Sequence, residues 1–299
     1  MGCGRPPARV VTAVSATDGL PPGIDELRTM LAPRAVVLDI DGTLIDDELV
    51  LQPRVRDAVR SAVGRLPVVL ATGRMFVSAL PWARELGVEE PLVCYQGALV
   101  RHLPRGDDPG AVLHEEGLTA PLARDCIDIA REHGWHRQAY VDDELLCEED
   151  RREAHVYARI AQVAIRFVDD LTAAVAAGST KIVCVSEDID VVDVCVATMR
   201  ERLRERVRVT RSMTQFVEMV SPRVNKAIAV ETVLATQGIA LSEAVAVGDA
   251  PNDAEMLAAA GVGVVVRGAR REVLVSADAV CAGPTDGGVA DVLERFGLV

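Results

Sequence analysis

Aromatic residues are scarce in this sequence: Phe, Trp and Tyr together make up 3% of its 299 residues, although 49% of the residues are hydrophobic. Ala and Val are far more frequent. This composition suits an α/β protein in which Ala-rich helices cover Val-rich strands. The length allows one large domain or two of ordinary size.

Positive charge is also in short supply, since no basic stripe offsets the formal net charge of −13. Such a surface repels nucleic acid and anionic membranes, so we expect neither as a partner. A small charged substrate can still bind where a local cation or a metal ion reverses the sign of the potential. We expect a monomer or a small homo-oligomer.

Closely spaced cysteines are missing. The seven cysteines are scattered, odd in number and without a Cys-x-x-Cys pair, which favours a reducing compartment and argues against a disulfide framework or a zinc site. No apolar run reaches the roughly 18 residues of a membrane span, and the apolar part of residues 9–14 is too short for a signal peptide. We therefore expect a cytoplasmic protein.

Alternating strands and helices begin at residue 35 and resume after residue 222. Residues 1–30 show no sustained periodicity, and we expect a loosely ordered extension with one helical turn near residues 25–31. The expected strands are 35–40, 67–74, 91–95, 244–249, 263–266 and 279–281, and the expected helices are 54–65, 77–86, 226–237 and 253–260. Continuous apolar runs in these strands predict a parallel sheet covered on both faces.

Residues 98–221 follow a different rhythm. Amphipathic helices (121–133 and 190–204) alternate there with half-buried strands (181–185, 207–210 and 216–220). We interpret this part as a compact α+β insertion into the parallel-sheet domain. Within it, the acidic run 142–150 is expected to be a solvated surface. Trp135 is expected to pack inside the insertion, with His133 and His136 on its surface.

Asp39 and Asp41 occupy unusual positions. The stretch AVVLDIDGTLIDD (35–47) runs apolar residues directly into Asp39 and places Asp41 two positions on, on the same face of an extended chain. A buried carboxylate is costly unless something pairs with it. Ligands bind at the carboxyl ends of strands in open parallel sheets, and Gly42 allows a tight turn whose amides can approach an anion. A turn in which one Asp only caps backbone groups does not account for an acid within the apolar run.

Further polar side chains stand at strand ends or at the start of a helix. They are Thr72 and Gly73, then Asp249, Asn252 and Asp253, and finally Lys226. Each alone has an ordinary interpretation as a turn, a helix cap or a solvated lysine. Together with Asp39 and Asp41 they converge on one rim of the predicted sheet. Their carboxylates repel one another unless a divalent cation lies among them, and oxygen ligands without His or Cys favour Mg²⁺.

Four motifs carry a resemblance to a known family. DIDGTL, LATGR, the lysine of PRVNKA, and GDAPNDAEML resemble the motifs of the haloacid dehalogenase superfamily. Their order and spacing are similar to those of the Cof-type phosphatases, in which a large C2-type cap lies between the second and third motifs; the tail 276–293 also resembles that subfamily. The resemblance implies a Rossmann-like catalytic core (31–97 and 222–299) and an α+β cap that sets specificity (98–221).

The resemblance also implies roles for individual residues. Asp39 would be the nucleophile that forms an aspartyl-phosphate, and Asp41 would protonate the leaving alkoxide and later activate water. Residues that would bind phosphate or substrate are Thr72, Gly73, Gln96, Lys226 and Asn252; residues around Mg²⁺ would be Asp39, Asp41 through its carbonyl, Asp249 and Asp253. Gln96 stands where the family usually has Asn, which shifts the expected contact with substrate.

The function we expect is Mg²⁺-dependent hydrolysis of a small phosphorylated metabolite, either a sugar phosphate or a phosphorylated cofactor. Three alternatives stay open: a phosphomutase on the same core, a signalling module phosphorylated on Asp39, and a member of the family that only binds. A receiver module would be much shorter and would lack the second acidic motif. Every catalytic position of the family is present, which argues against the binding-only alternative.

Overall fold

The computed structural model describes residues 11–12, 20–29, 31–211 and 213–299. Most of the predicted N-terminal extension therefore lies outside the described residues. Its described part is not loosely ordered as expected, because Ile24 and Leu27 are buried and Gly23 forms a parallel bridge with Val280. The helices are α1 (Pro53–Val63), α2 (Phe76–Leu86), α3 (Ala120–Glu132), α4 (Arg152–Ala161), α5 (Leu171–Ala174), α6 (Ile189–Leu203), α7 (Lys226–Ala235), α8 (Ala254–Ala259), α9 (Arg271–Leu274) and α10 (Gly288–Arg295). No helix within the described ranges is both long and apolar enough to cross a membrane.

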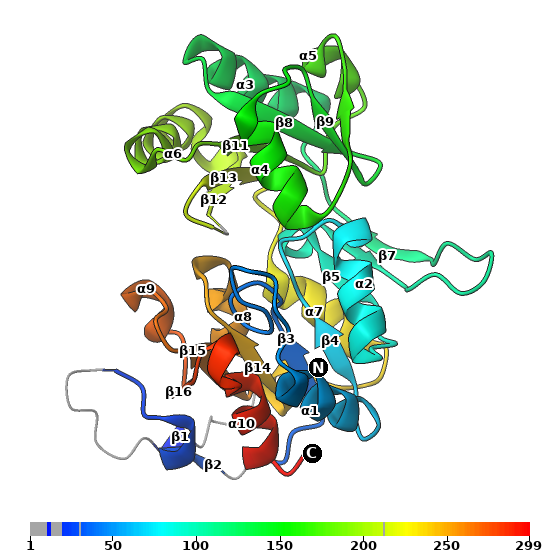
Figure 1. Ribbon diagram of the computed structural model, residues 1–299, viewed down its shortest axis with the longest axis vertical. Coiled ribbons are helices and arrows are strands. Elements are labelled where there is room, and N and C mark those ends of the chain that lie inside the picture. Colours follow the sequence, from blue (N-terminus) through cyan, green and yellow to red (C-terminus); the bar gives the residue numbers. More distant parts are fainter. Residues whose placement is uncertain (1–10, 13–19, 30, 212) are drawn as a thin grey trace, which may run out of the picture.

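In the described part of the chain, the strands form two main sheets and two small ones. They are β1 (Val11–Thr12), β2 (Arg28–Thr29), β3 (Ala35–Leu38), β4 (Val68–Leu70), β5 (Leu92–Cys94), β6 (Leu99–Arg101), β7 (Val112–Glu115), β8 (His136–Val141), β9 (Glu144–Cys147), β10 (Ile165–Phe167), β11 (Lys181–Val185), β12 (Arg208–Thr210), β13 (Phe216–Val220), β14 (Ala244–Gly248), β15 (Val262–Val266) and β16 (Ala279–Cys281). The two main sheets lie in two stacked units of the molecule (Figure 1).

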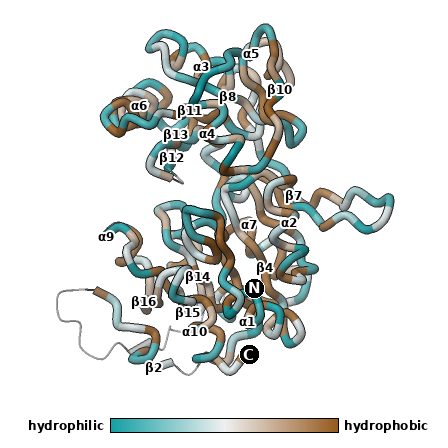
Figure 2. The backbone as a smooth tube through the Cα atoms, viewed as in Figure 1, coloured by the Kyte–Doolittle hydropathy of each residue, from teal (hydrophilic) through white to brown (hydrophobic). Residues whose placement is uncertain are grey.

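The first unit is the core, built on a parallel sheet of order β16-β15-β14-β3-β4. Successive residues of β3 enter different apolar clusters: Val36 and Leu38 pack with α1, α2 and α10, whereas Ala35 and Val37 pack with α7 and α8. Both faces of the sheet are therefore covered, which explains the continuous apolar runs. The predicted parallel-sheet core is confirmed, and Figure 2 shows hydrophobic residues running through it.

Helix α1 illustrates how the sequence pattern produces this packing. Pro53 occupies its first turn, where the missing amide hydrogen has no helical partner in any case. Val55, Ala58, Val59 and Ala62 recur at helical spacing and are buried against the sheet. Fully burying a Val side chain contributes about 1.5–3 kcal/mol, so this face holds the helix in place.

The chain leaves the core sheet after β5. Ala71 and Val93 form a parallel bridge that joins the β4 edge to β5, and β5 in turn pairs with the antiparallel strands β6 and β7. The turn after β5 has left-handed backbone angles at three successive residues, with φ values of 52° at Tyr95, 64° at Gln96 and 102° at Gly97. Such a conformation is costly for non-glycine residues and persists only where the surroundings hold it.

The second unit contains a mixed sheet of order β10-β9-β8-β11-β13-β12, whose strands lie between residues 136 and 220 of the predicted cap. The strands β6 and β7, which the prediction also assigned to the cap, instead form a sheet with β5 of the core unit. Helices α3, α5 and α6 pack on one face, in a cluster that includes Ile182 and Met219. The other face carries α4 and is turned toward the core (Figure 1). Alternate residues of β11 and β13 point to this second face, which therefore includes Lys181, Phe216 and Glu218.

Two expectations about the cap are wrong in part. The run 142–150 is not simply a solvated surface, because β9 buries Leu145, Leu146 and Cys147 within it. His136 is buried in β8, where its ring nitrogen lies 3.3 Å from an oxygen of Gln138. Strand pairing across the cap sheet, rather than local polarity, determines both positions. His133 is exposed and stacks on the half-buried Trp135.

Candidate active site

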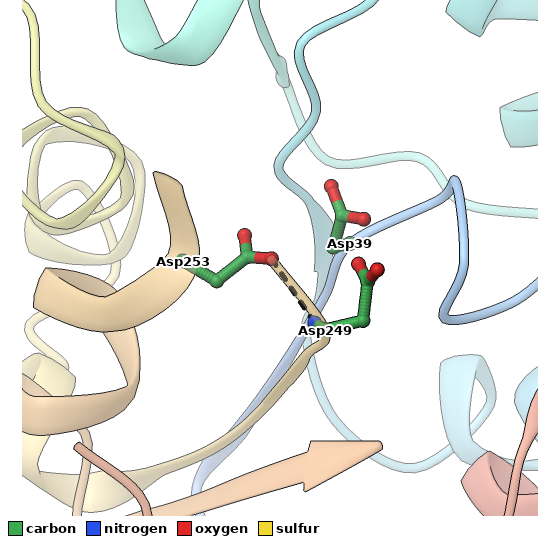
Figure 3. A group of neighbouring side chains, drawn as sticks. All are labelled: Asp39, Asp249 and Asp253. Carbon is green, nitrogen blue, oxygen red and sulfur yellow. Dashed lines mark hydrogen bonds between the residues drawn. The ribbon is translucent and has the colours of Figure 1, made fainter. Parts of the chain in front are cut away.

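The strand order brings the predicted site residues to one edge of the core sheet. Asp39 follows β3, and Asp249 follows the adjacent strand β14. Thr72 follows β4, on the other side of β3. Figure 3 shows the carboxylates of Asp39 and Asp249 close together, with Asp253 approaching from the start of α8. The predicted convergence is therefore present in the structure.

Lys226 joins two of these acids. It is the first residue of α7, which is capped by the side chain of Asn225, and its side chain is fully buried. The Lys226 Nζ lies 2.6 Å from Asp39 Oδ1 and 2.6 Å from Asp253 Oδ1. One ammonium thus neutralises part of the negative charge that the fold gathers here.

Asp253 acts mainly as a structural acceptor. Its second oxygen accepts hydrogen bonds of 3.1 Å from the backbone amides of Asp249 and Ala250. Because both oxygens are engaged, Asp253 fixes Lys226 and the loop after β14. Gly42 lies beside this loop with φ 74°, and a Cβ there would come 2.4 Å from Asp249 Oδ2, so only glycine fits.

The pKa values of two site aspartates are raised well above those of free carboxyl groups. Burial raises the pKa of Asp39 from 3.8 to about 7, with Asp253 and Asp41 adding to the rise and Lys226 opposing it. Burial and the neighbouring Asp39 raise the pKa of Asp249 to about 9. For Lys226, burial alone would lower the pKa, but Asp253 and Asp39 outweigh it and raise the pKa above its usual value.

This donor set fits a hard divalent cation. Asp39, Asp249 and Asp253 each offer an oxygen, and these three atoms lie within 4.8 Å of one another. Burial and the neighbouring carboxylates raise the two aspartate pKa values, and a bound cation would favour the charged forms of both groups. Oxygen ligands are those that Mg²⁺ prefers. Since both Asp253 oxygens are engaged, Asp39 and Asp249 are the better candidates for direct ligands.

Arg74 is a site residue that the sequence analysis missed. Its guanidinium is buried and grips both oxygens of Asp41, at 2.8 Å from Nε and 2.6 Å from Nη2. It also donates to the backbone carbonyl of Ile160 in the cap at 3.3 Å. This geometry fixes the orientation of Asp41. The position of Arg74 in LATGR, two residues after Thr72, was the available signal.

Thr72 and Gly73 lie in the loop between β4 and α2. Thr72 is buried, and its Oγ1 accepts a hydrogen bond from the Arg74 amide at 3.1 Å. Gly73 borders a cavity of about 40 Å³ together with Asp39, Asp41 and Asn252. The loop thus lies beside the carboxylates of Asp39 and Asp41.

Gln96 and Asn252 form a pair. Asn252 Nδ2 donates to Gln96 Oε1 at 2.6 Å, and Gln96 Nε2 donates to Glu218 of the cap at 3.0 Å. The Asn252 Oδ1 atom is buried and has no hydrogen-bond partner among the described residues. The Gln96 side chain, which is one methylene longer than the Asn usual in the family, therefore reaches Glu218 of the cap through its amide.

A wider cleft opens beside the 40 Å³ cavity. Its volume is about 860 Å³, and Asp41 and Asp249 border both spaces. The cap contributes Arg159 and Arg211 to its lining, and the core contributes Arg270. The cap side of the small cavity is mostly apolar, and its residues there are Tyr157, Ile160, Ala161, Met213, Phe216 and the charged Glu218.

Two further charged residues escaped the sequence analysis. Lys181 and Glu218 are 0% and 1% exposed and lie 3.1 Å apart on the core-facing side of the cap sheet. A sequence signal existed, because the chain contains only two lysines, Lys181 and Lys226, among 32 lysine and arginine residues. Both lysines are buried in the region that joins the candidate site to the cap.

Comparisons with known proteins agree with this architecture. A family model described as haloacid dehalogenase-like hydrolase matches residues 36–293, so the chain belongs to this family of hydrolases. A phosphoglycolate phosphatase of Archaeoglobus fulgidus is 27% identical, covering 90% of this chain and 100% of the relative. An HMP-PP phosphatase of Serratia proteamaculans is 27% identical over 78% of this chain and 83% of its own length.

A solved structure has the same fold. It is a haloacid dehalogenase-like hydrolase from Bacteroides thetaiotaomicron, with a TM-score of 0.78 and 25% identity, covering 88% of this chain and 99% of its own. The predicted family and the predicted fold, a parallel-sheet core with an inserted cap, are therefore confirmed.

Proposed function

We propose that this protein is a Mg²⁺-dependent phosphatase that hydrolyses a small phosphorylated metabolite through an aspartyl-phosphate. The observation that carries the proposal is the buried cluster of Asp39, Lys226 and Asp249 at the carboxyl edge of the core sheet. Relatives named as phosphatases support the same reaction class.

In the first step, an oxygen of Asp39 attacks phosphorus while the bond from phosphorus to the leaving oxygen breaks. The Lys226 ammonium orients the Asp39 carboxylate and attracts the phosphoryl oxygens. Asp41 gives a proton to the departing alkoxide. In the second step Asp41 takes a proton from water, which attacks the aspartyl-phosphate, releases inorganic phosphate and restores Asp39.

The phosphoryl oxygens would be bound by Thr72, the Gly73 loop, Lys226 and Asn252. Asn252 borders the cavity next to Asp39. Its Nδ2 carries two N–H groups, of which one donates to Gln96 and the other would donate to a phosphoryl oxygen. Because both functional atoms of Gln96 are engaged, Gln96 would act by orienting Asn252. The leaving group would extend into the 860 Å³ cleft between the core and the cap.

Asp39, Asp249 and the Asp41 carbonyl would hold Mg²⁺, with Asp253 supporting them. The ion would supply positive charge that offsets the carboxylates and the phosphate. The remaining steps depend on side chains of this chain, as described above.

Magnesium affinity is expected to rise with pH. The raised pKa values of about 7 and about 9 mean that folded Asp39 and Asp249 keep protons that the unfolded chain has released above pH 4. Without metal, the free energy of unfolding therefore falls as the pH rises from about 4 toward 9. Because Mg²⁺ requires both carboxylate forms, its affinity should increase on the order of 10²- to 10³-fold between pH 6 and pH 8.

Calorimetric titration at several pH values measures this change. Asp249→Asn should lose most of the affinity and keep only the weaker pH dependence that Asp39 gives. Asp57→Asn, at a side chain that is 65% exposed on α1, should bind as the wild type does. An affinity that stays constant from pH 6 to pH 8 would contradict the proposed ligands.

The phosphatase proposal is tested by phosphate release. Purified protein with Mg²⁺ should hydrolyse a generic aryl phosphate, because the site requires only an accessible phosphate monoester. A panel of phosphorylated metabolites then identifies the substrate class. Transfer of phosphate to a second sugar without release of inorganic phosphate would favour a phosphomutase instead, and a stable phospho-protein would favour a signalling module.

A further inference from the structure

A chain of buried hydrogen bonds connects the cap to the phosphate-binding loop of the core. Asn252 donates to Gln96, and Gln96 donates to Glu218 of β13. Glu218 accepts from Lys181 of β11 at 3.1 Å, and Lys181 Nζ donates to the backbone carbonyl of Gly73 at 3.1 Å. The chain therefore begins and ends in core residues that border the catalytic carboxylates, and its middle lies in the cap.

Lys181 is held firmly where it makes this contact. Its ammonium lies 4.8 Å from the ring centre of Tyr140, 5.6 Å from that of Tyr157 and 5.7 Å from that of Tyr95. Burial by itself would lower the pKa of Lys181, but Glu218 and Tyr157 outweigh it and raise the pKa above the usual value. The lysine therefore stays charged and donates strongly to Gly73.

The backbone that receives these contacts is strained and depends on the cap elsewhere as well. Tyr95 and Gln96 have positive φ angles, and their amides donate to the carbonyls of Arg74 and Thr72. Asp143, in the turn between β8 and β9, accepts from the Tyr95 hydroxyl at 2.6 Å. It also accepts from the amides of residues 76 and 77 at the start of α2, at 3.0 Å and 2.8 Å. Asp143 and the Lys181–Glu218 pair, which lie in different parts of the cap, thus hold the same two core segments, residues 73–77 and 95–96.

We propose that Lys181 and Glu218 are positioning residues, which fix the loop of Thr72 and Gly73 against the strained turn at Gln96 so that the phosphate site is assembled only with the cap in place. The cap then does more than cover the substrate. Removing the ammonium frees the Gly73 carbonyl and lets the phosphate-binding amides move, and displacement of reacting groups by about 1 Å can lower a rate by roughly 10²-fold. This catalytic consequence rests on the proposed function.

The test compares three variants of the full-length protein. Lys181→Met removes the ammonium that lies beside the buried Glu218 carboxylate, which also destabilises the fold. Lys181→Met/Glu218→Gln removes both charges and keeps an acceptor for Gln96, so its unfolding midpoint should return toward that of the wild type. Arg137→Met is the matched control. It breaks the ion pair between Arg137 and Glu148, which lies within the cap and whose side chains are 10% and 11% exposed.

Steady-state kinetics with an aryl phosphate should separate a positioning role from a structural one. For the double variant we expect kcat to fall by roughly 10- to 100-fold, with a much smaller change in KM, although its stability recovers. Arg137→Met should lose stability and keep the wild-type kcat. A double variant with wild-type kcat would overturn the proposal.

Hydrogen exchange provides a readout that needs no activity. Amides of residues 72–76 and 95–98 should exchange faster in the double variant than in the wild type, and should be unchanged in Arg137→Met. Unchanged exchange in the double variant would also overturn the proposal. If the wild type itself hydrolyses no phosphate ester, the proposed function fails, and the exchange data still decide whether Lys181 and Glu218 position the loop.

Discussion

Asp39→Asn should abolish phosphate release while the protein stays folded. The carboxamide cannot attack phosphorus, so we expect kcat to fall on the order of 10⁴-fold or more, as for other deleted nucleophiles. Burial already disfavours the charged form of Asp39, whose pKa is raised to about 7. A neutral side chain of the same shape should therefore leave the unfolding midpoint close to that of the wild type.

Asp41→Asn is the natural comparison for this variant. General acid catalysis typically contributes about 10²–10⁴-fold, and an aryl phosphate has a good leaving group that needs little protonation. Asp41→Asn should therefore retain much more activity on an aryl phosphate than on an alkyl phosphate.

Wild-type protein that is quenched with acid during turnover should carry phosphate on the peptide that contains Asp39. Equal rates for wild type and Asp39→Asn would contradict the proposed nucleophile.

Lys226→Met should have the largest effect on stability. The substitution leaves Asp39 and Asp253 facing each other without the ammonium that lies 2.6 Å from each. Removing one partner of a buried ion pair typically costs about 3–5 kcal/mol of the free energy of unfolding. Phosphatase activity should also be lost, because the phosphoryl group would lose its main cationic side chain.

Denaturant unfolding measures the loss of stability. A further variant separates this loss from the loss of activity. Lys226→Met/Asp253→Asn removes one of the stranded charges and should recover part of the stability without recovering activity. Arg34→Met, which breaks an ion pair of exposed side chains with Glu243, should cost less than about 1 kcal/mol. A Lys226→Met protein as stable as the wild type would show that the ammonium does not hold the acids together.

The core and its acidic residues could be predicted from local sequence. The apolar run before Asp39 and the one before Asp249 each specify a strand covered on both faces, and parallel strands end at the same edge. Adjacent placement of β3 and β14 then brings the two acids together. The positions of Asp39, Asp41, Lys226 and Asp249 therefore followed from strand boundaries and motif resemblance.

The contacts across the cap could not be predicted in this way. Whether Lys181 meets Glu218 depends on the register of β11 against β13, where Val183 lies opposite Glu218. No local pattern fixes such a register. The same holds for Asp143, which was assigned to a solvated acidic run although its carboxylate accepts hydrogen bonds from the core. Each residue was ordinary in its own segment and acquired its role from a distant one.

The rarity of lysine has a practical consequence. Both ε-amino groups of the chain are enclosed, one beside Asp39 and one beneath the three tyrosine rings, and arginine does not react with mild acylating reagents. Acylation of lysine in the native protein can therefore proceed only when the two units separate or unfold locally. The rate of side-chain amine labelling would report that opening directly, without any engineered probe.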